Sequence, residues 1–125
     1  MLHDRKMLPA IPASDLARAR AWYADKLGLT TDQEEPEALL YRSGQDGLFL
    51  LFSSDGAGTA QHQLTAWVVE DLEAEVAELR RRGVEFEEYD RPGLRTVNGI
   101  AVTPAGKAAW FKDSEGNVLT LTQLS

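Results

Sequence analysis

The sequence predicts an α+β fold made of two copies of one βαβββ module, and three observations lead to this prediction. Two amphipathic helical segments begin with the same dipeptide, Asp15-Leu16 and Asp71-Leu72, 56 positions apart (71 minus 15). Each follows one strand-like segment and precedes three more, so the order of elements repeats. A stretch rich in small residues, SSDGAGTA, separates the two copies.

The whole chain, 1–125, is expected to form a single domain. The first module covers about 5–53, a linker about 54–61, and the second module about 62–125. A chain of this length buries roughly two-thirds of its unfolded surface, whereas half of it alone would bury much less. The two modules are therefore expected to pack against each other.

The helices are predicted from their capping residues and their apolar spacing. Asp15 and Asp71 are N-cap residues, while Gly28 and Gly83 follow the last apolar positions, where glycine commonly ends a helix. Apolar residues recur every three or four positions and form one buried stripe on each helix: Leu16, Ala19, Tyr23 and Leu27 on the first, and Leu72, Val76 and Leu79 on the second.

Eight segments have the composition of strands: 7–14, 30–35, 38–43 and 47–54 in the first module, and 62–70, 84–90, 107–113 and 117–123 in the second. Segment 91–106 is predicted to be a long loop. Residues 48–52 and 118–122 are apolar at nearly every position, which is typical of strands covered on both faces. With helices on one face, the other face is expected to curve around a pocket.

The composition narrows the choice of partners and location. The net charge is −7, which makes nucleic acid an unsuitable partner, since binding to phosphates requires basic residues. A neutral or cationic small molecule is compatible with this charge. The chain contains no cysteine and no apolar run of membrane-spanning length, so a cytoplasmic protein without disulfides is expected.

Three stretches, IPASDLARARAWYADKLGL, WVVEDLEAEVAELRRRGV and AAWFKDSEGNVLTLTQ, together resemble the vicinal oxygen chelate (VOC) superfamily. This superfamily includes glyoxalase I, extradiol dioxygenases, fosfomycin-resistance proteins and bleomycin-resistance proteins. The resemblance covers most of the chain. It implies two βαβββ modules forming a curved mixed sheet around a cup, with the helices on the outer face, usually completed in a homodimer.

The resemblance also identifies the positions where metal-using members hold a divalent ion, on the first and last strands of each module. The corresponding residues here are Leu8, Leu50, Leu64 and Thr120. Leucine offers no donor atom, and threonine is not a usual ligand. No metal and no cofactor is therefore expected at these positions.

His62 is the remaining candidate for metal or proton-transfer chemistry near the cup. It has the same strand parity as Leu64, so its side chain is expected to point toward the cup, nearer the rim. A rim or surface histidine without a chemical role fits the same pattern.

Other residues are candidates for lining the cup. A hairpin turn centred on Glu115 places Trp110 opposite Thr120 and on the same face, which makes Trp110 a candidate for stacking on a ligand. Further candidates are Leu50 and Phe52 on the fourth strand, Tyr41 on the third strand, and Arg95 and Asn98 in a loop that could cover the pocket.

The sequence favours a non-catalytic, metal-free binding protein that sequesters an aromatic or cationic small molecule, such as a natural product or drug. Bleomycin-resistance proteins act in this way within the resembled family, which connects the chain with antibiotic resistance. Two alternatives stay open. One is a VOC metalloenzyme, a lyase, isomerase or dioxygenase, with a displaced metal site; the other is a structural module with a vestigial cup.

Overall fold

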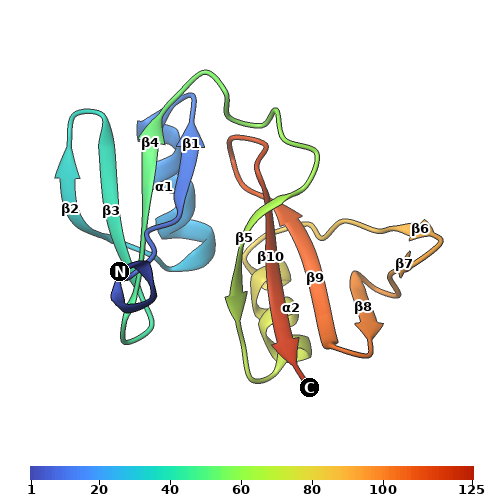
Figure 1. Cartoon of the computed structure of the whole chain (residues 1–125). Helices are drawn as coiled ribbons and strands as arrows, with labels where there is room; N and C mark the ends of the chain where they lie inside the picture. Colours follow the sequence, from blue (N-terminus) through green and yellow to red (C-terminus); the bar gives the residue numbers. More distant parts are fainter.

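The computed structural model describes residues 1–125 and shows two four-stranded sheets, each backed by one helix (Figure 1). A short 3₁₀ helix, η1 (Leu2–Asp4), precedes the first module. The first module contains β1 (Ala10–Ala13), α1 (Leu16–Leu27), β2 (Thr31–Glu35), β3 (Ala38–Ser43) and β4 (Gly47–Ser53). The second contains β5 (Gln63–Val68), α2 (Leu72–Arg81), the two-residue strands β6 (Asp90–Arg91) and β7 (Leu94–Arg95), β8 (Ile100–Thr103), β9 (Gly106–Lys112) and β10 (Val118–Leu124).

Both sheets have the same topology. The strand order is β1-β4-β3-β2 in the first module and β5-β10-β9-β8 in the second. In each sheet the strand before the helix pairs in parallel with the last strand, and the other pairs are antiparallel. The predicted α+β fold of two βαβββ modules is therefore confirmed.

One strand of the second module differs from its prediction. Segment 84–90 was expected to be a full strand, and 91–106 a loop. The structure instead has β8 within that loop, and Phe86 forms only an isolated bridge with Phe111. The carboxylate of Glu88 accepts hydrogen bonds from the Gly99 amide and the Thr96 hydroxyl, so this part of the segment is bound to the loop. The apolar residues of β8 take the position beside β9.

The helix boundaries follow the predicted caps. The Asp15 carboxylate accepts a hydrogen bond from the Arg18 amide at 3.0 Å, and the Asp71 carboxylate accepts one from the Ala74 amide at 3.1 Å. Gly28 ends α1 with a φ of 70°, in the left-handed region that favours glycine. Neither helix is long and apolar enough to cross a membrane.

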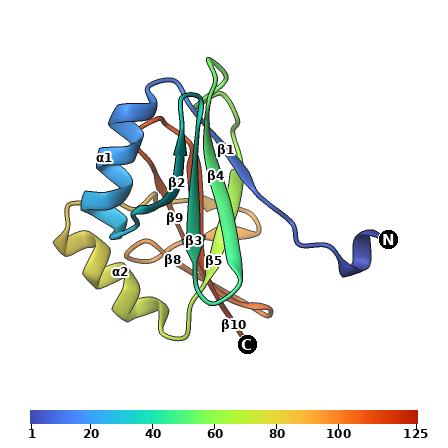
Figure 2. The same cartoon turned by 90° about the vertical axis from the view of Figure 1, so that its left-hand side faces the viewer.

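The helices lie on one side of the two sheets, and the hydrophobic core fills the space between (Figure 2). The core is continuous across the modules. The Trp22 ring of α1 stacks on Phe111 of β9 with centroids 6.4 Å apart, and Phe49 of β4 contacts Trp67 of β5 edge-on at 6.0 Å. Burial of these aromatic surfaces holds the modules together. Each module needs this contact because it is too small to bury a large core alone.

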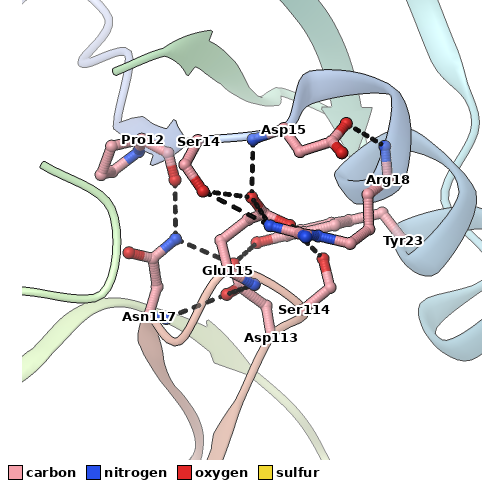
Figure 3. Close-up of polar contacts among 9 residues, drawn as sticks. All are labelled: Pro12, Ser14, Asp15, Arg18, Tyr23, Asp113, Ser114, Glu115 and Asn117. Carbon is pink, nitrogen blue, oxygen red and sulfur yellow. Dashed lines mark hydrogen bonds and ion pairs between the residues drawn. The ribbon is translucent and has the colours of Figure 1, made fainter. Parts of the chain in front are cut away.

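A polar cluster at one end of the molecule adds a second connection between the modules (Figure 3). We call it the clamp, and it consists of Asp113, Glu115 and Asn117 in the turn between β9 and β10. The Asp113 carboxylate accepts hydrogen bonds from the Tyr23 hydroxyl at 2.6 Å and from the amides of Glu115 and Asn117 at 2.9 Å. Because Asp113 and Tyr23 are both buried, this contact excludes water.

Glu115 connects the same turn to the beginning of α1. Its side chain is 0% exposed, and its carboxylate accepts hydrogen bonds from the Asp15 amide at 2.9 Å and from the Arg18 guanidinium at 2.9 and 3.0 Å. The hydroxyls of Ser14 and Ser114 donate to it as well, at 3.2 and 2.8 Å. A negative charge beside the N-terminus of α1 is further stabilised by the helix dipole.

Asn117 joins the turn to β1 and to the linker. Its amide nitrogen donates to the Pro12 carbonyl at 2.8 Å, and its oxygen accepts from the Gly58 amide at 3.1 Å. Gly58 has a φ of 75°, and a Cβ at that position would meet the carbonyl oxygen of Glu115 at 2.6 Å. The linker therefore needs a glycine where it passes the clamp.

Candidate functional site

The faces of both sheets that point away from the helices form one side of the molecule, which we call the open face. Figure 1 shows the sheets with α1 and α2 behind them, and Figure 2 shows only the N-terminal segment with η1 on the other side. Phe49 and Leu51 of β4 are buried toward the helices, whereas the alternate residues Leu48, Leu50 and Phe52 stay partly exposed on the open face. Such apolar side chains favour contact with a ligand or another protein surface.

The second sheet contributes an aromatic and a hydroxyl group to the open face. Trp110 pairs with Thr120 in the β9–β10 register, which confirms the predicted pairing of these two residues. The ring of Tyr89 contacts Trp110 edge-on, with centroids 5.5 Å apart. Trp110 is partly exposed, while Thr120 is only 4% exposed and its hydroxyl has no hydrogen-bond partner. Of this pair, the Trp110 ring is therefore the part that a ligand can reach.

The structure also tests how well this face fits a metal ion. The residues at the expected ligand positions are Leu8, which precedes β1, Leu50, Leu64 and Thr120. The registers place Ala10 beside Leu50 and Ala66 beside Thr120. Whether the first-strand ligand position is taken as Leu8 or Ala10, or in the second module as Leu64 or Ala66, its side chain supplies no nitrogen or oxygen donor. No group of three or more His, Asp or Glu side chains is arranged to hold an ion, so the residues present do not fit the metal of the resembled family.

Tyr41 lies elsewhere than expected. It is fully buried on the helix side of β3, where it pairs in register with Phe49 and stacks on its ring at 4.8 Å. Residues paired across strands share a face, so Tyr41 belongs to the core and does not line the open face. Its register could not be fixed from sequence because both faces of β3 carry apolar residues.

The remaining three candidates are exposed. His62 lies just before β5, and its ring nitrogen donates to the Gln63 carbonyl at 2.9 Å. Arg95 belongs to β7 and pairs with Asp90 at 3.3 Å. Asn98 has a positive φ of 53°, and its carbonyl accepts a hydrogen bond from Arg80 of α2 at 2.7 Å. None of the three forms a hydrogen bond or ion pair with a residue of the open face.

A groove of about 570 Å³ lies at the seam between the two sheets. Its lining comes from β4, from β5 and from the N-terminal segment before β1, and it includes Met7, Pro9, Leu48, Ala66 and Val68. Lys6 and Asp46, 3.7 Å apart, stand at its polar edge. This volume lies in the range of small-molecule pockets.

None of the ten residues predicted to bind a ligand lines this groove, although Leu50, Phe52, Trp110 and Thr120 have the strand parity of the open face. Leu64 packs against the core. Strand parity places Leu48 on this face from the sequence, together with Leu50 and Phe52, and the same parity could have identified Ala66 and Val68. The contribution of Lys6, Met7 and Pro9 could not be identified, because their position depends on how the N-terminal segment crosses the seam.

A family model matches most of the amino-acid sequence. Residues 8–121 match the Glyoxalase/Bleomycin resistance protein/Dioxygenase superfamily. The chain belongs to this superfamily. The match covers both modules and the linker, and it confirms the resemblance seen in the sequence.

Solved structures of the superfamily resemble the chain over nearly its full length. A bleomycin-binding protein complexed with bleomycin has a TM-score of 0.74 at 19% identity and covers 97% of this chain and 99% of its own. TnmS3, an antibiotic-binding protein from a Streptomyces species, has a TM-score of 0.63 at 26% identity, with 98% of each chain covered. FosX, a fosfomycin resistance protein from Listeria monocytogenes complexed with Mn(II), has a TM-score of 0.71 at 12% identity and covers 98% of this chain and 91% of its own. No curated protein sequence matches at a significant level.

Proposed function

We propose that this member of the superfamily binds and sequesters a small molecule on its open face, without a metal ion and without catalysis. The observation that carries the proposal is the composition of the open face. Aliphatic residues and Trp110 lie at and around the positions that coordinate the metal ion in metal-using members. An apolar surface with an aromatic ring and few polar groups is suited to binding. The positions of the metal ligands in metal-using members carry Leu8, Leu50, Leu64 and Thr120, which supply no charged group for general acid–base or metal-assisted reactions.

The similar structures support the chemical class of the ligand. Two of them are named for binding bleomycin or an antibiotic, and the antibiotic-binding protein shares 26% of its sequence with this chain. The net charge of −7 favours a cationic or neutral molecule over an anion. An aromatic or cationic natural product or drug, held within the cytoplasm, is the ligand class that fits these observations.

The experiment that tests the proposal is native mass spectrometry of protein purified without chelators or metal-affinity columns. A protein at its apo mass, or with an organic adduct, supports binding without metal, and the adduct mass restricts the ligand. About one divalent ion per chain would contradict the proposal and favour a VOC metalloenzyme with a displaced site. A titration with bleomycin, followed by calorimetry, then measures affinity for one member of the proposed ligand class.

Replacing Trp110 by alanine is expected to weaken the affinity for the adduct or for bleomycin by about 1–3 kcal/mol, the scale of a lost desolvated aromatic contact. Isothermal titration measures the change. Val102→Ala is the control, because Val102 is exposed on β8 but does not belong to the open face. Val102 pairs with Lys107, and Lys107 lies on the same side of β9 as Phe111, which faces the helices. Equal affinities of the Trp110 variant and the unaltered protein would remove Trp110 from the site.

We also propose that two copies assemble so that the open face of each is completed by the other. Met7 and Leu8, in the segment beside the groove, are 85% and 46% exposed, which is unfavourable for apolar residues of an isolated chain. The melting temperature is therefore expected to rise with protein concentration, as it does for an assembly that dissociates on unfolding. A constant melting temperature together with a monomeric mass in solution would contradict the dimer.

A further inference from the structure

A second cavity lies on the helix side of the molecule and meets the open-face groove at Ser43, Trp67 and Val68. It has a volume of about 220 Å³ and opens between the C-terminal end of α1 and the side of α2. Its walls are formed by Leu27, Leu29, Trp67, Leu79, Phe111 and Leu121. A cavity of about 150 Å³ with a similar apolar lining can bind benzene, so this one has room for a benzene-sized ring and a short chain.

One charged group stands on this apolar wall. Glu75 of α2 lines the cavity, is exposed to solvent, and forms neither an ion pair nor a side-chain hydrogen bond. The nearby cations at the ends of the helices have other partners, since Arg82 pairs with Glu78 at 2.9 Å and Lys26 with Asp25 at 3.3 Å. The Glu75 carboxylate is therefore the unpaired charge beside an apolar cavity.

The aromatic walls add a second feature that favours a cation. Trp67 and Phe111 lie nearly parallel, with an interplanar angle of 21° and centroids 6.5 Å apart, and both rings line the cavity. The face of an aromatic ring attracts a positive charge, and it also packs well against another apolar ring.

We propose that this helix-side cavity binds a small organic cation that has an apolar, ring-sized body and one ammonium group. The body fills the space among the aliphatic and aromatic walls, and the ammonium group pairs with the Glu75 carboxylate at the mouth. This site differs from the one proposed for the open face. The two share Ser43, Trp67 and Val68 at the seam, but the other walls of the helix-side cavity come from α1, α2, β9 and β10, and those of the groove come from the N-terminal segment, β4 and β5.

The test uses 2-phenylethylammonium as the probe and 2-phenylethanol as its neutral counterpart. Binding is followed by the NMR signal of the Trp67 indole N–H, which donates to the Ser43 hydroxyl at 3.0 Å. The ammonium probe is expected to shift this signal in a saturable manner and to bind more tightly than the alcohol. Because Trp67 lines both cavities, the indole signal of Trp110 is followed in parallel, and a saturable shift of that signal would indicate binding on the open face.

Two variants locate the charge that is responsible. Glu75→Gln is expected to weaken binding of the ammonium probe by about three- to tenfold and to leave the alcohol unaffected, as for a partly exposed ion pair. Asp46→Asn removes a carboxylate from the edge of the open-face groove and is expected to change neither affinity. The exposure of both residues makes a folding defect in either variant easy to exclude by circular dichroism.

Several results would overturn the proposal. These are an unshifted Trp67 signal at saturating probe, equal affinity of the Glu75 variant and the unaltered protein, and a loss of affinity in the Asp46 variant alone. The last result would assign the cation to the open face. Trp110→Ala is expected to leave the probe affinity unchanged, so failure of this site and failure of the open-face site can be told apart.

Discussion

Replacing Asp113 by alanine is expected to lower the free energy of unfolding by about 3–5 kcal/mol. The variant leaves the Tyr23 hydroxyl and the amides of Glu115 and Asn117 without their acceptor in a buried region. Each buried polar group without a partner costs about 1–3 kcal/mol, and the local backbone relaxes only in part. Urea denaturation measures the change as a shift in the transition midpoint.

Tyr23→Phe provides the matched control for this prediction. It removes one hydrogen bond and leaves the amide contacts of Asp113 in place, so its expected cost is only about 1 kcal/mol. Burial, together with the negative charge of Asp113, raises the pKa of the Tyr23 hydroxyl, which therefore remains a donor at all ordinary pH values. A loss below about 1 kcal/mol in the Asp113 variant would show that the turn repacks without its central acceptor.

The second large effect is expected from pH and concerns Glu115. Burial by itself raises the pKa of this carboxyl, but the hydrogen bonds from Arg18, the Asp15 amide, Ser114 and Ser14 outweigh it and lower the pKa from 4.5 to about 2. The pKa in the folded protein is thus below the pKa in the unfolded chain. The resulting stability is fully present above about pH 4.5 and is lost as the pH falls toward about 2.

The expected loss over this interval is roughly 3 kcal/mol, from a pKa difference of about 2.5 at 1.36 kcal/mol for each pKa unit. It is measured as the free energy of unfolding in urea at a series of pH values. Glu115→Gln cannot change its charge, so its stability is expected to be lower near neutral pH and to fall less steeply in acid. An identical acid dependence in the variant and the unaltered protein would assign the loss to other carboxyl groups.

The fold could be predicted from sequence wherever a local pattern determines the structure. The capping aspartates at positions 15 and 71 fix the starts of both helices, and the turn centred on Glu115 fixes the register of Trp110 against Thr120. The strand β8 (Ile100–Thr103) was missed, because 84–90 was predicted to be the strand after α2. Segment 84–90 alternates like a strand, but the charges of Glu85, Glu87 and Glu88 are better placed beside solvent and the loop than in the sheet.

The site could be predicted only as a face, not as a pocket. Strand parity identified Leu50, Phe52 and Trp110 as residues of the open face, and it fails for Tyr41 because apolar residues on both faces of β3 make its register ambiguous. The groove depends on how two sheets and the N-terminal segment meet, and the helix-side cavity on how α1 and α2 approach each other. Such relations are set by packing between distant residues, for which a single sequence contains no local pattern.

The position of the clamp along the chain determines when the two modules can become fixed to each other during synthesis. Its hydrogen bonds to the first module join residues 90 to 105 positions apart, and its members lie in the turn between β9 and β10, which follows every other element of the domain except β10. The first module thus emerges with its open face and the N-terminus of α1 unsupported, and contacts of such long range form slowly. A protein truncated before residue 113 retains one complete module but lacks every hydrogen bond that the turn makes to Pro12, Arg18 and Tyr23.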